Sequence, residues 1–184
     1  MVFDASKYGT PLQAILAVDG DGRRAMPLAG GKPVKEAVEV LRGRTAFELF
    51  PAAYAPEAAL SGLYLYFCAY DESHAISQDI GSAEGSFWHG ILHRQEPDPA
   101  NAAYWFRRVG QHAVFPALRD AASAIVGQGS GVRFPLKEKW DPFAFIEFCE
   151  QARRTPGSKD EEIAMAIQLV EWQLLFDTCA RPVQ

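Results

Sequence analysis

Helix start signals recur along this sequence, and they constrain the fold more than any other feature. Three of them place a capping side chain directly before a proline: Thr10-Pro11, Asp98-Pro99 and Asp141-Pro142. The cap oxygen accepts an orphan backbone N–H of the first helical turn, and a proline at the next position has no N–H to lose. Ser158 and Glu161 form a further start signal, a capping box ahead of an apolar run. The sequence therefore predicts a chain made mainly of helices.

Strand signals are weak by comparison, because the short apolar runs Ala14–Val18 and Val132–Leu136 do not alternate for long enough. The helices that we expect cover residues 11–18, 33–42, 56–79, 84–95, 99–109, 112–127, 142–154 and 159–180. No internal repeat and no long linker divides the chain. We therefore expect an all-α fold, a single-domain multi-helix bundle over residues 1–184 with short N-terminal helices, in which residues 1–30 are a candidate N-terminal extension.

Composition limits the classes of partner. The formal net charge of −5 argues against sequence-independent nucleic-acid binding, whose affinity comes from neutralising phosphates. The most apolar window, Ala58–Ala69, is too short to cross a bilayer, and Met1–Lys7 lacks the basic and apolar pattern of a secretory signal. We therefore expect a cytoplasmic protein that binds neither nucleic acid nor membrane. The twelve Phe and four Trp residues promise large buried contacts, and a homodimer is compatible with that aromatic surplus.

Two further expectations concern burial. The cysteines Cys68, Cys149 and Cys179 are odd in number, widely spaced and without a Cys-x-x-Cys pair, so buried free thiols are expected. In the helix expected at 159–180, a wide apolar stripe indicates deep burial. The acidic residues of that helix are expected to face solvent: Glu161, Glu162 and Glu171.

The helix expected at 56–79 changes character along one face. Its apolar stripe is formed by Leu60, Leu63, Tyr64 and Phe67, at i, i+3, i+4 and i+7 spacing. The same spacing continues to three polar residues, Asp71, His74 and Gln78. Either the end of this helix leaves the core, or the stripe runs into a polar cavity with a hydrogen-bonding wall.

The next expected helix carries the sharpest chemical pattern. Beside an apolar stripe that includes Trp88 lie His89, His93 and Glu96, at i, i+4 and i+7 spacing. Two imidazoles one turn apart can chelate a divalent metal, and a carboxylate one turn later can complete the ligand set. The His-Glu-x-x-His pattern of zinc proteases is absent, because Gly90 follows His89. The alternative is a pair of histidines beside Glu96 that cap the helix or form a salt bridge.

The segment after it mixes polar and aromatic side chains. Asp98 is expected to cap the helix at 99–109, and Gly110 to end it in the left-handed conformation. Asn101, Tyr104 and Arg108 share one face, with Trp105 beside it. Such a face suits a ligand pocket, which needs apolar walls and a few fixed polar groups. It also suits a buried network with no ligand, whose expected pairs join Arg94, Arg107 or Arg108 to Glu96 or Asp98.

All four histidines, His74, His89, His93 and His112, fall within this stretch of the chain. Short loops between helices bring neighbouring segments together, so clustering in sequence favours clustering in space. Histidine is suited both to proton transfer near neutral pH and to metal ligation. Whether His112 joins the other three is left open by the sequence.

Residues 74–110 also resemble a family of uncharacterised bacterial and fungal proteins. The residues that carry the resemblance are His74, the run Ser86-Phe87-Trp88-His89-Gly90-Ile91-Leu92-His93-Arg94-Gln95-Glu96-Pro97-Asp98, Asn101 and the run Tyr104-Trp105-Phe106-Arg107-Arg108-Val109-Gly110. The resemblance covers about a quarter of the chain. It implies a stand-alone domain of that kind, and it implies no activity.

The leading hypothesis is a small-molecule or divalent-metal site in this segment. The expected metal ligands are His89, His93 and Glu96, and the expected ligand-binding residues are His74, Asn101, Tyr104 and Arg108. If the site is catalytic, metal-assisted hydrolysis or oxidation is the expected class of reaction, with the arginine orienting an anionic group. The competing hypothesis is a helical binding or assembly domain without chemistry, in which the same residues form a network between helices.

Overall fold

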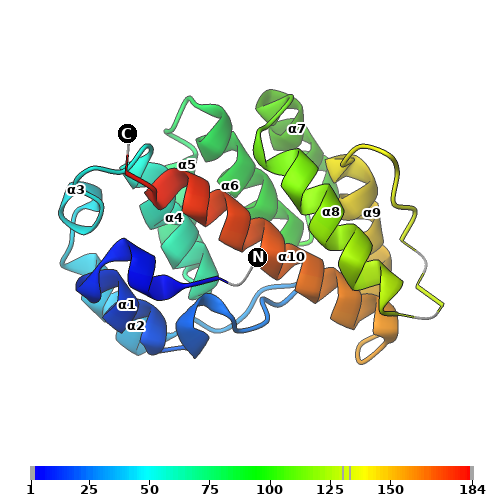
Figure 1. The fold of residues 1–184 in the computed structure, drawn as a ribbon, viewed down its shortest axis with the longest axis horizontal. Coiled ribbons are helices and arrows are strands. Elements are labelled where there is room, and N and C mark those ends of the chain that lie inside the picture. The colour runs from blue at the N-terminus through cyan, green and yellow to red at the C-terminus, as the bar shows by residue number, and fades with distance from the viewer. Residues whose placement is uncertain (1–2, 130, 133, 183–184) are drawn as a thin grey trace.

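The computed structural model describes residues 3–129, 131–132 and 134–182, and this part of the chain is all α (Figure 1). Within it, ten α-helices and two short 3₁₀ turns, Ala5–Tyr8 and Gly20–Gly22, account for the regular structure. The helices are α1 (Thr10–Ala17), α2 (Lys35–Arg42), α3 (Ala46–Leu49), α4 (Pro56–Tyr66), α5 (Tyr70–Ser77), α6 (Ala83–Gln95), α7 (Pro99–Val109), α8 (Val114–Gly127), α9 (Pro142–Ala152) and α10 (Lys159–Ala180).

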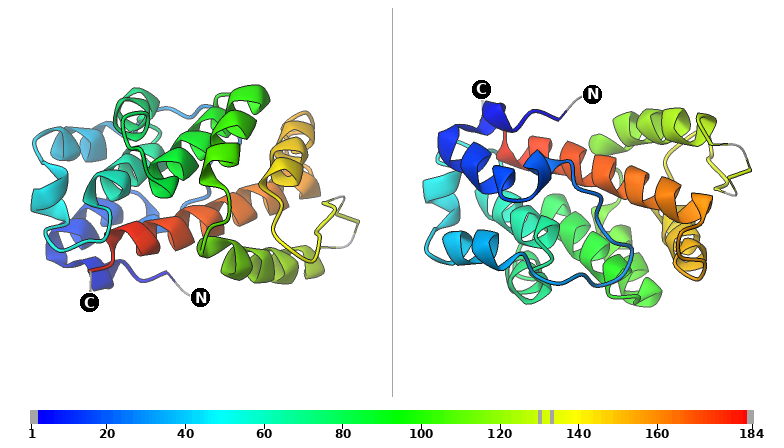
Figure 2. Two further views of the ribbon diagram at one scale, coloured as in Figure 1. Left: turned by 90° about the horizontal axis from the view of Figure 1, so that it is seen from above. Right: turned by 90° about the horizontal axis from the view of Figure 1, so that it is seen from below.

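Helix α10 is the central helix, and it runs across the molecule with α1 and α8 on either side (Figure 1). It packs against α4, α8 and α9. Trp172 and Phe176 of α10 are fully buried, and the ring of Phe3 lies 5.5 Å from the Trp172 ring. The described part of the N-terminal segment therefore contributes to the same core as the C-terminal helix, which the views from above and below also show (Figure 2).

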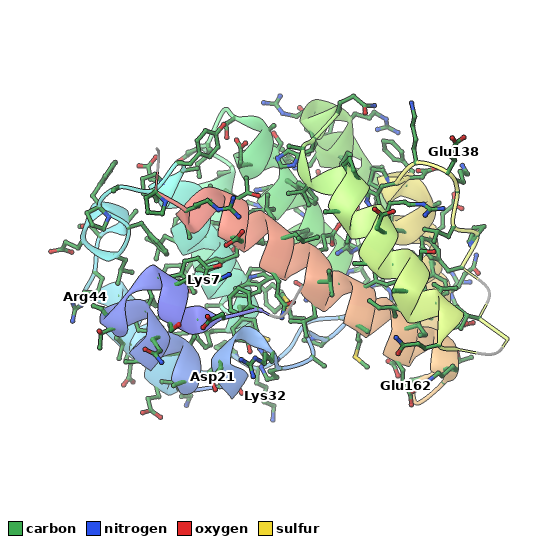
Figure 3. All side chains as sticks on the ribbon, in the orientation of Figure 1. Lys7, Asp21, Lys32, Arg44, Glu138 and Glu162 are labelled. Atoms are coloured by element: carbon green, nitrogen blue, oxygen red, sulfur yellow. The ribbon has the colours of Figure 1, made fainter. Side chains whose placement is uncertain are left out.

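The 22 residues of α10 are also sufficient, by length and composition alone, to cross a membrane. However, 61% of the most apolar window of this helix is buried inside the fold. The buried central helix of a globular core can have the same length and apolar composition as a membrane-spanning helix. In contrast to the buried α10 window, charged side chains such as Arg44, Glu138 and Glu162 lie at the edges of the molecule (Figure 3).

Most of the helix start signals act as expected. Asp98 Oδ1 accepts the Asn101 N–H at 3.0 Å, Asp141 Oδ1 accepts the Phe143 N–H at 3.0 Å, and Ser158 Oγ accepts the Glu161 N–H at 3.2 Å. Gly110 ends α7 as predicted, with a positive φ of +63°, but its ψ of −129° lies outside the expected left-handed helical region. The expected cap at Thr10 is wrong, because α1 begins at Thr10 itself and follows Gly9, whose carbonyl oxygen accepts the first helical N–H.

The single helix expected over 56–79 is also wrong, because the chain breaks between α4 and α5. Cys68 adopts a φ of +58° at the break. The carbonyl groups that would continue the helix bind other segments: Arg24 donates to the Tyr66 oxygen, and the Val34 N–H donates to the Phe67 oxygen at 3.0 Å. The face from Leu60 to Phe67 is buried as expected, but Asp71 and Gln78 are exposed beyond the break.

Glu171 does not face solvent as expected, because it forms a fully buried ion pair with Arg94 of α6. Arg94 Nη1 lies 3.3 Å from Glu171 Oε1, and Arg94 Nη2 also donates to Gln168 Oε1 at 3.2 Å. Burial opposes the charge of Arg94, but Glu171 opposite it raises the pKa of the guanidinium. Gln168 Nε2 in turn donates to the Pro27 carbonyl oxygen at 3.0 Å. The pair thus joins α6, α10 and the segment before α2.

Two glycines let α6 approach its neighbours closely. A Cβ atom on Gly62 of α4 would lie 2.6 Å from the Trp88 ring, and one on Gly90 of α6 would lie 2.9 Å from the Phe106 ring of α7. Any larger residue at either position would force the helices apart. The close packing of α4, α6 and α7 fixes where the histidines of α6 point. Elsewhere in the core, the three cysteines are buried free thiols, as predicted.

Candidate metal centre

Three of the four histidines converge between α5 and α6. His74 lies on α5, and His89 and His93 lie one turn apart on α6. One ring nitrogen from each lies within 4.8 Å of the others, and the ring centroids are 4.5 Å (74–89), 4.7 Å (89–93) and 5.5 Å (74–93) apart. Clustering in the sequence therefore corresponds to clustering in space for these three residues.

The His89 ring is oriented by a serine of α5. The Ser77 hydroxyl donates its single proton to the Ser73 carbonyl oxygen at 2.8 Å, so its oxygen accepts from His89 Nδ1, also at 2.8 Å. That assignment places the proton of the neutral ring on Nδ1 and leaves the lone pair on Nε2. Ser61 of α4 donates to the same Ser73 carbonyl at 3.0 Å, which ties α4 to this arrangement.

The His93 ring contacts Glu96 and Asn101. Its Nδ1 lies 2.9 Å from Glu96 Oε2, so the carboxylate can accept the Nδ1 proton. Asn101 Nδ2 of α7 lies 3.0 Å from its Nε2 and 3.4 Å from its Nδ1, so the amide group lies against the ring near both nitrogens. Glu96 therefore lies beside His93 on the Nδ1 side of the ring, where it accepts a hydrogen bond from the neutral imidazole.

This arrangement is the one that metal-ligating histidines usually show. Such residues donate one ring N–H to a carboxylate, carbonyl or hydroxyl group, which fixes the tautomer, and they bind the ion through the other nitrogen. Ser77 and Glu96 supply those contacts to His89 and His93. In a tetrahedral zinc site the ligating nitrogens are about 3.3 Å apart, as follows from Zn–N distances of about 2.0 Å. The nitrogens here lie within 4.8 Å of one another, so a bound zinc ion would require them to move closer together.

Burial keeps two of the rings neutral. It lowers the pKa of His89 from its ordinary 6.5 to about 3, and the neighbouring rings of His93 and His74 add to the shift. Burial also lowers the pKa of His93, against the opposing effect of Glu96. A neutral imidazole is the form that binds a metal ion. His89 and His93 are therefore in the neutral form at neutral pH.

The same shift predicts an acid-sensitive fold. Between the folded pKa of about 3 and the ordinary value of 6.5 for His89, the unfolded chain binds a proton that the folded chain excludes. The contribution of His89 to the free energy of unfolding of the metal-free protein should therefore be fully present above pH 6.5. It should be lost progressively as the pH falls from 6.5 toward 3. Thermal unfolding of chelator-treated protein across this range measures the effect. A His89→Gln variant should show a shallower decline, and parallel curves for parent and variant would contradict the assignment.

Helix α7 forms the outer wall of the site. The Trp105 ring covers His89 at a centroid distance of 4.1 Å, and the Arg108 guanidinium lies 5.1 Å from the Trp105 ring. Tyr104 is 50% exposed and Arg108 is exposed, whereas His74, Asn101 and Trp105 are half-buried. The histidine cluster therefore borders the surface, and all four predicted ligand-binding residues, His74, Asn101, Tyr104 and Arg108, lie around this border.

Two predicted participants take other positions. Glu96 lies beyond His93 and outside the group of three converging ligand atoms. His112 does not join the cluster, because it lies beside the Phe87 ring, with its Nε2 3.7 Å from Glu84. The predicted pairing of arginines with Glu96 or Asp98 is wrong among the described residues, since Arg94 binds Glu171 and Arg108 lies over aromatic rings.

Ser77 is the residue at this site that the sequence did not single out for it. Its relevant signal is the i, i+4 spacing with Ser73, which gives the hydroxyl a backbone partner on its own helix and leaves its oxygen free to accept. The role of Trp105 as a cover for His89 follows only from the packing of α6 on α7.

Comparison with known proteins does not place the chain in a family. No protein-family model, no curated protein and no solved structure matches it. The resemblance of residues 74–110 to uncharacterised bacterial and fungal proteins therefore stays a prediction, and the function has to be argued from the site itself.

Proposed function

We propose that this protein binds one divalent transition-metal ion through His74, His89 and His93. The observation that supports the proposal is the convergence of three ring nitrogens within 4.8 Å of one another. Imidazole nitrogens suit zinc, copper, iron and nickel, whereas magnesium and calcium prefer oxygen ligands. Three protein ligands also leave a coordination position for water or substrate, as catalytic zinc sites do.

The ligand set favours hydrolysis over oxidation. A zinc ion held by three histidines would lower the pKa of a bound water molecule to about 7 and so supply a nucleophile at neutral pH. Iron oxygenases of the non-haem class instead use two histidines and one carboxylate on a common face. Glu96 is the nearest candidate for that carboxylate, but it contacts His93 at Nδ1, on the outer side of the ring.

The residues of α7 suit the capture of a small anionic substrate. Arg108 is exposed, and its guanidinium lies beside the Trp105 ring at the border of the site. Its planar set of donors can hold a carboxylate or phosphate through two parallel hydrogen bonds. Asn101 Nδ2 lies 3.0 Å from Nε2 of His93, so its amide would lie next to an ion bound there and could donate a hydrogen bond to a substrate group.

Metal titration tests the proposal directly. Chelator-treated protein, purified without an affinity tag, should bind about one equivalent of zinc or cobalt per chain and should not respond to magnesium. The cobalt-loaded protein should show the intense visible absorption of a four-coordinate site. A His112→Asn variant serves as the control, because this histidine lies outside the cluster, and it should bind the same amount. Protein that takes up neither zinc nor cobalt would overturn the proposal.

The alternative is a helical binding or assembly domain in which these residues form a network without an ion. The observation that favours it is that both nitrogens of His93 already have protein partners, Glu96 and Asn101. In that case the contacts serve only to hold α5, α6 and α7 together. The titration separates the two functions, because the network binds no stoichiometric metal.

A further inference from the structure

A second group of titratable side chains lines a cavity away from the histidine cluster. The cavity has a volume of about 580 Å³ and is formed by the loop before α4, the first turn of α6, the corner between α7 and α8, and the end of α10. Its wall includes Tyr54, Glu84, His112 and Arg181. Glu84 precedes His89, the nearer of the two histidines of the cluster on α6, by five residues, which corresponds to about 8 Å along the helix axis and about 140° around it. None of the three cluster histidines lines this cavity. The cavity is therefore distinct from the metal centre.

Glu84 is the most deeply buried charged group on this wall, with 8% of its surface exposed. One near neighbour of its carboxylate is the Tyr54 hydroxyl, whose pKa the Glu84 charge raises. Its other near neighbour is His112, whose Nε2 lies 3.7 Å from Glu84 Oε1, which is beyond hydrogen-bond distance. Both neighbours come from segments far from Glu84 in the sequence.

Neither neighbour neutralises the charge of Glu84. His112 Nδ1 accepts the Val114 N–H at 3.2 Å, which places the single proton of the neutral ring on Nε2. Burial lowers the pKa of His112, so the ring is neutral near pH 7. Arg181 is the cation on the described wall, and it pairs with Asp177. A buried carboxylate without a cationic partner is costly unless a partner arrives from outside.

We propose that this cavity binds a small cationic ligand, an amine or guanidine, whose charge pairs with Glu84. A volume of about 580 Å³ lies within the range of small-molecule sites. Tyr54 is 58% exposed at the rim of the cavity, and its ring offers a face for the cation or for an apolar part of the ligand. His112 Nε2 lies 3.7 Å from Glu84 Oε1, so the ring borders the place where the cation would sit.

Binding of benzylamine to the full chain, measured by titration calorimetry and NMR, tests this assignment. Benzylamine should bind saturably, whereas benzyl alcohol and benzoate, which have the same ring without the positive charge, should not. Glu84→Gln should weaken benzylamine binding at least about tenfold, because the ammonium group loses both its countercharge and a charge-assisted hydrogen bond. Glu57→Gln is the matched control, because Glu57 is exposed in the first turn of α4, and it should bind like the parent.

A second variant keeps the test decisive if Glu84→Gln does not fold. Tyr54→Ala changes an exposed side chain, so the fold should persist while benzylamine binding weakens several-fold. The assignment is overturned if benzylamine does not bind the parent, if benzyl alcohol binds as well, or if the variants bind like the parent. Zinc loading should leave benzylamine binding unchanged, so the result does not depend on the metal centre.

Discussion

Replacing Glu171 with alanine is expected to lower the free energy of unfolding by about 3–5 kcal/mol, which is the usual cost of removing one partner of a buried ion pair. The change would leave the Arg94 guanidinium fully buried without its countercharge, and Gln168 would be its remaining side-chain hydrogen-bond partner. Denaturant unfolding followed by circular dichroism measures the difference. We expect the same helical content at low denaturant and an earlier midpoint.

Glu162 supplies a matched control on the same helix. It is exposed and pairs with Lys159 at 2.9 Å, and a surface pair of this kind contributes about 0–1 kcal/mol. Replacing both Arg94 and Glu171 with apolar residues of similar volume should restore much of the stability, because neither buried charge then remains. A Glu171→Ala cost no larger than that of Glu162→Ala would show that the pair does not stabilise the fold.

The helices of this protein could be predicted because their start signals are local. Asp98, Asp141 and Ser158 cap helices through backbone groups two or three residues away, so the sequence around each cap contains the whole interaction. The all-α class follows from these signals and from the absence of sustained alternation. The same reasoning misplaced the cap at Thr10, where Gly9 supplies a backbone carbonyl and no side chain.

The errors arose where distant segments decide the structure. The break between α4 and α5 depends on Arg24 and Val34, which bind carbonyl groups at the end of α4 and lie more than thirty residues earlier. The periodicity of α10 alone predicts that Glu171 is exposed, whereas its burial depends on Arg94 of α6. In neither case does the local periodicity contain the deciding contact.

In the candidate site, too, the features that local sequence decides could be predicted and those that depend on distant segments could not. The spacing of His89 and His93 on one helix is local, so the sequence predicts that these two rings are neighbours. Glu96 follows the same spacing, but the helix ends at Gln95, and the carboxylate then lies on the outer side of His93. The third ring, His74, comes from α5, and its approach depends on how α5 packs on α6 after the break at Cys68.

Replacing His93 with alanine should weaken zinc binding by at least about 100-fold, because the loss of a residue that only orients a ligand already costs about 10–100-fold. The ring contributes one of the three nitrogens that converge within 4.8 Å, and two nitrogens on different helices form a poorer site. Competition with a chromogenic chelator measures the affinity. His74→Ala and His89→Ala should show losses of the same order.

Ser77→Ala separates coordination from orientation at the same site. It removes the hydroxyl that fixes His89 through Nδ1 at 2.8 Å but leaves all three rings in place, so we expect a loss of about tenfold, smaller than that of any ring variant. If the three rings formed only a structural network, Ser77→Ala and His93→Ala would both lower stability, and neither would change a metal affinity. A metal centre therefore predicts a specific order of losses in zinc affinity. The loss is largest for the His74, His89 and His93 variants, smaller for Ser77→Ala and absent for the His112 variant. Equal zinc affinity across the whole series would exclude ligation by these residues.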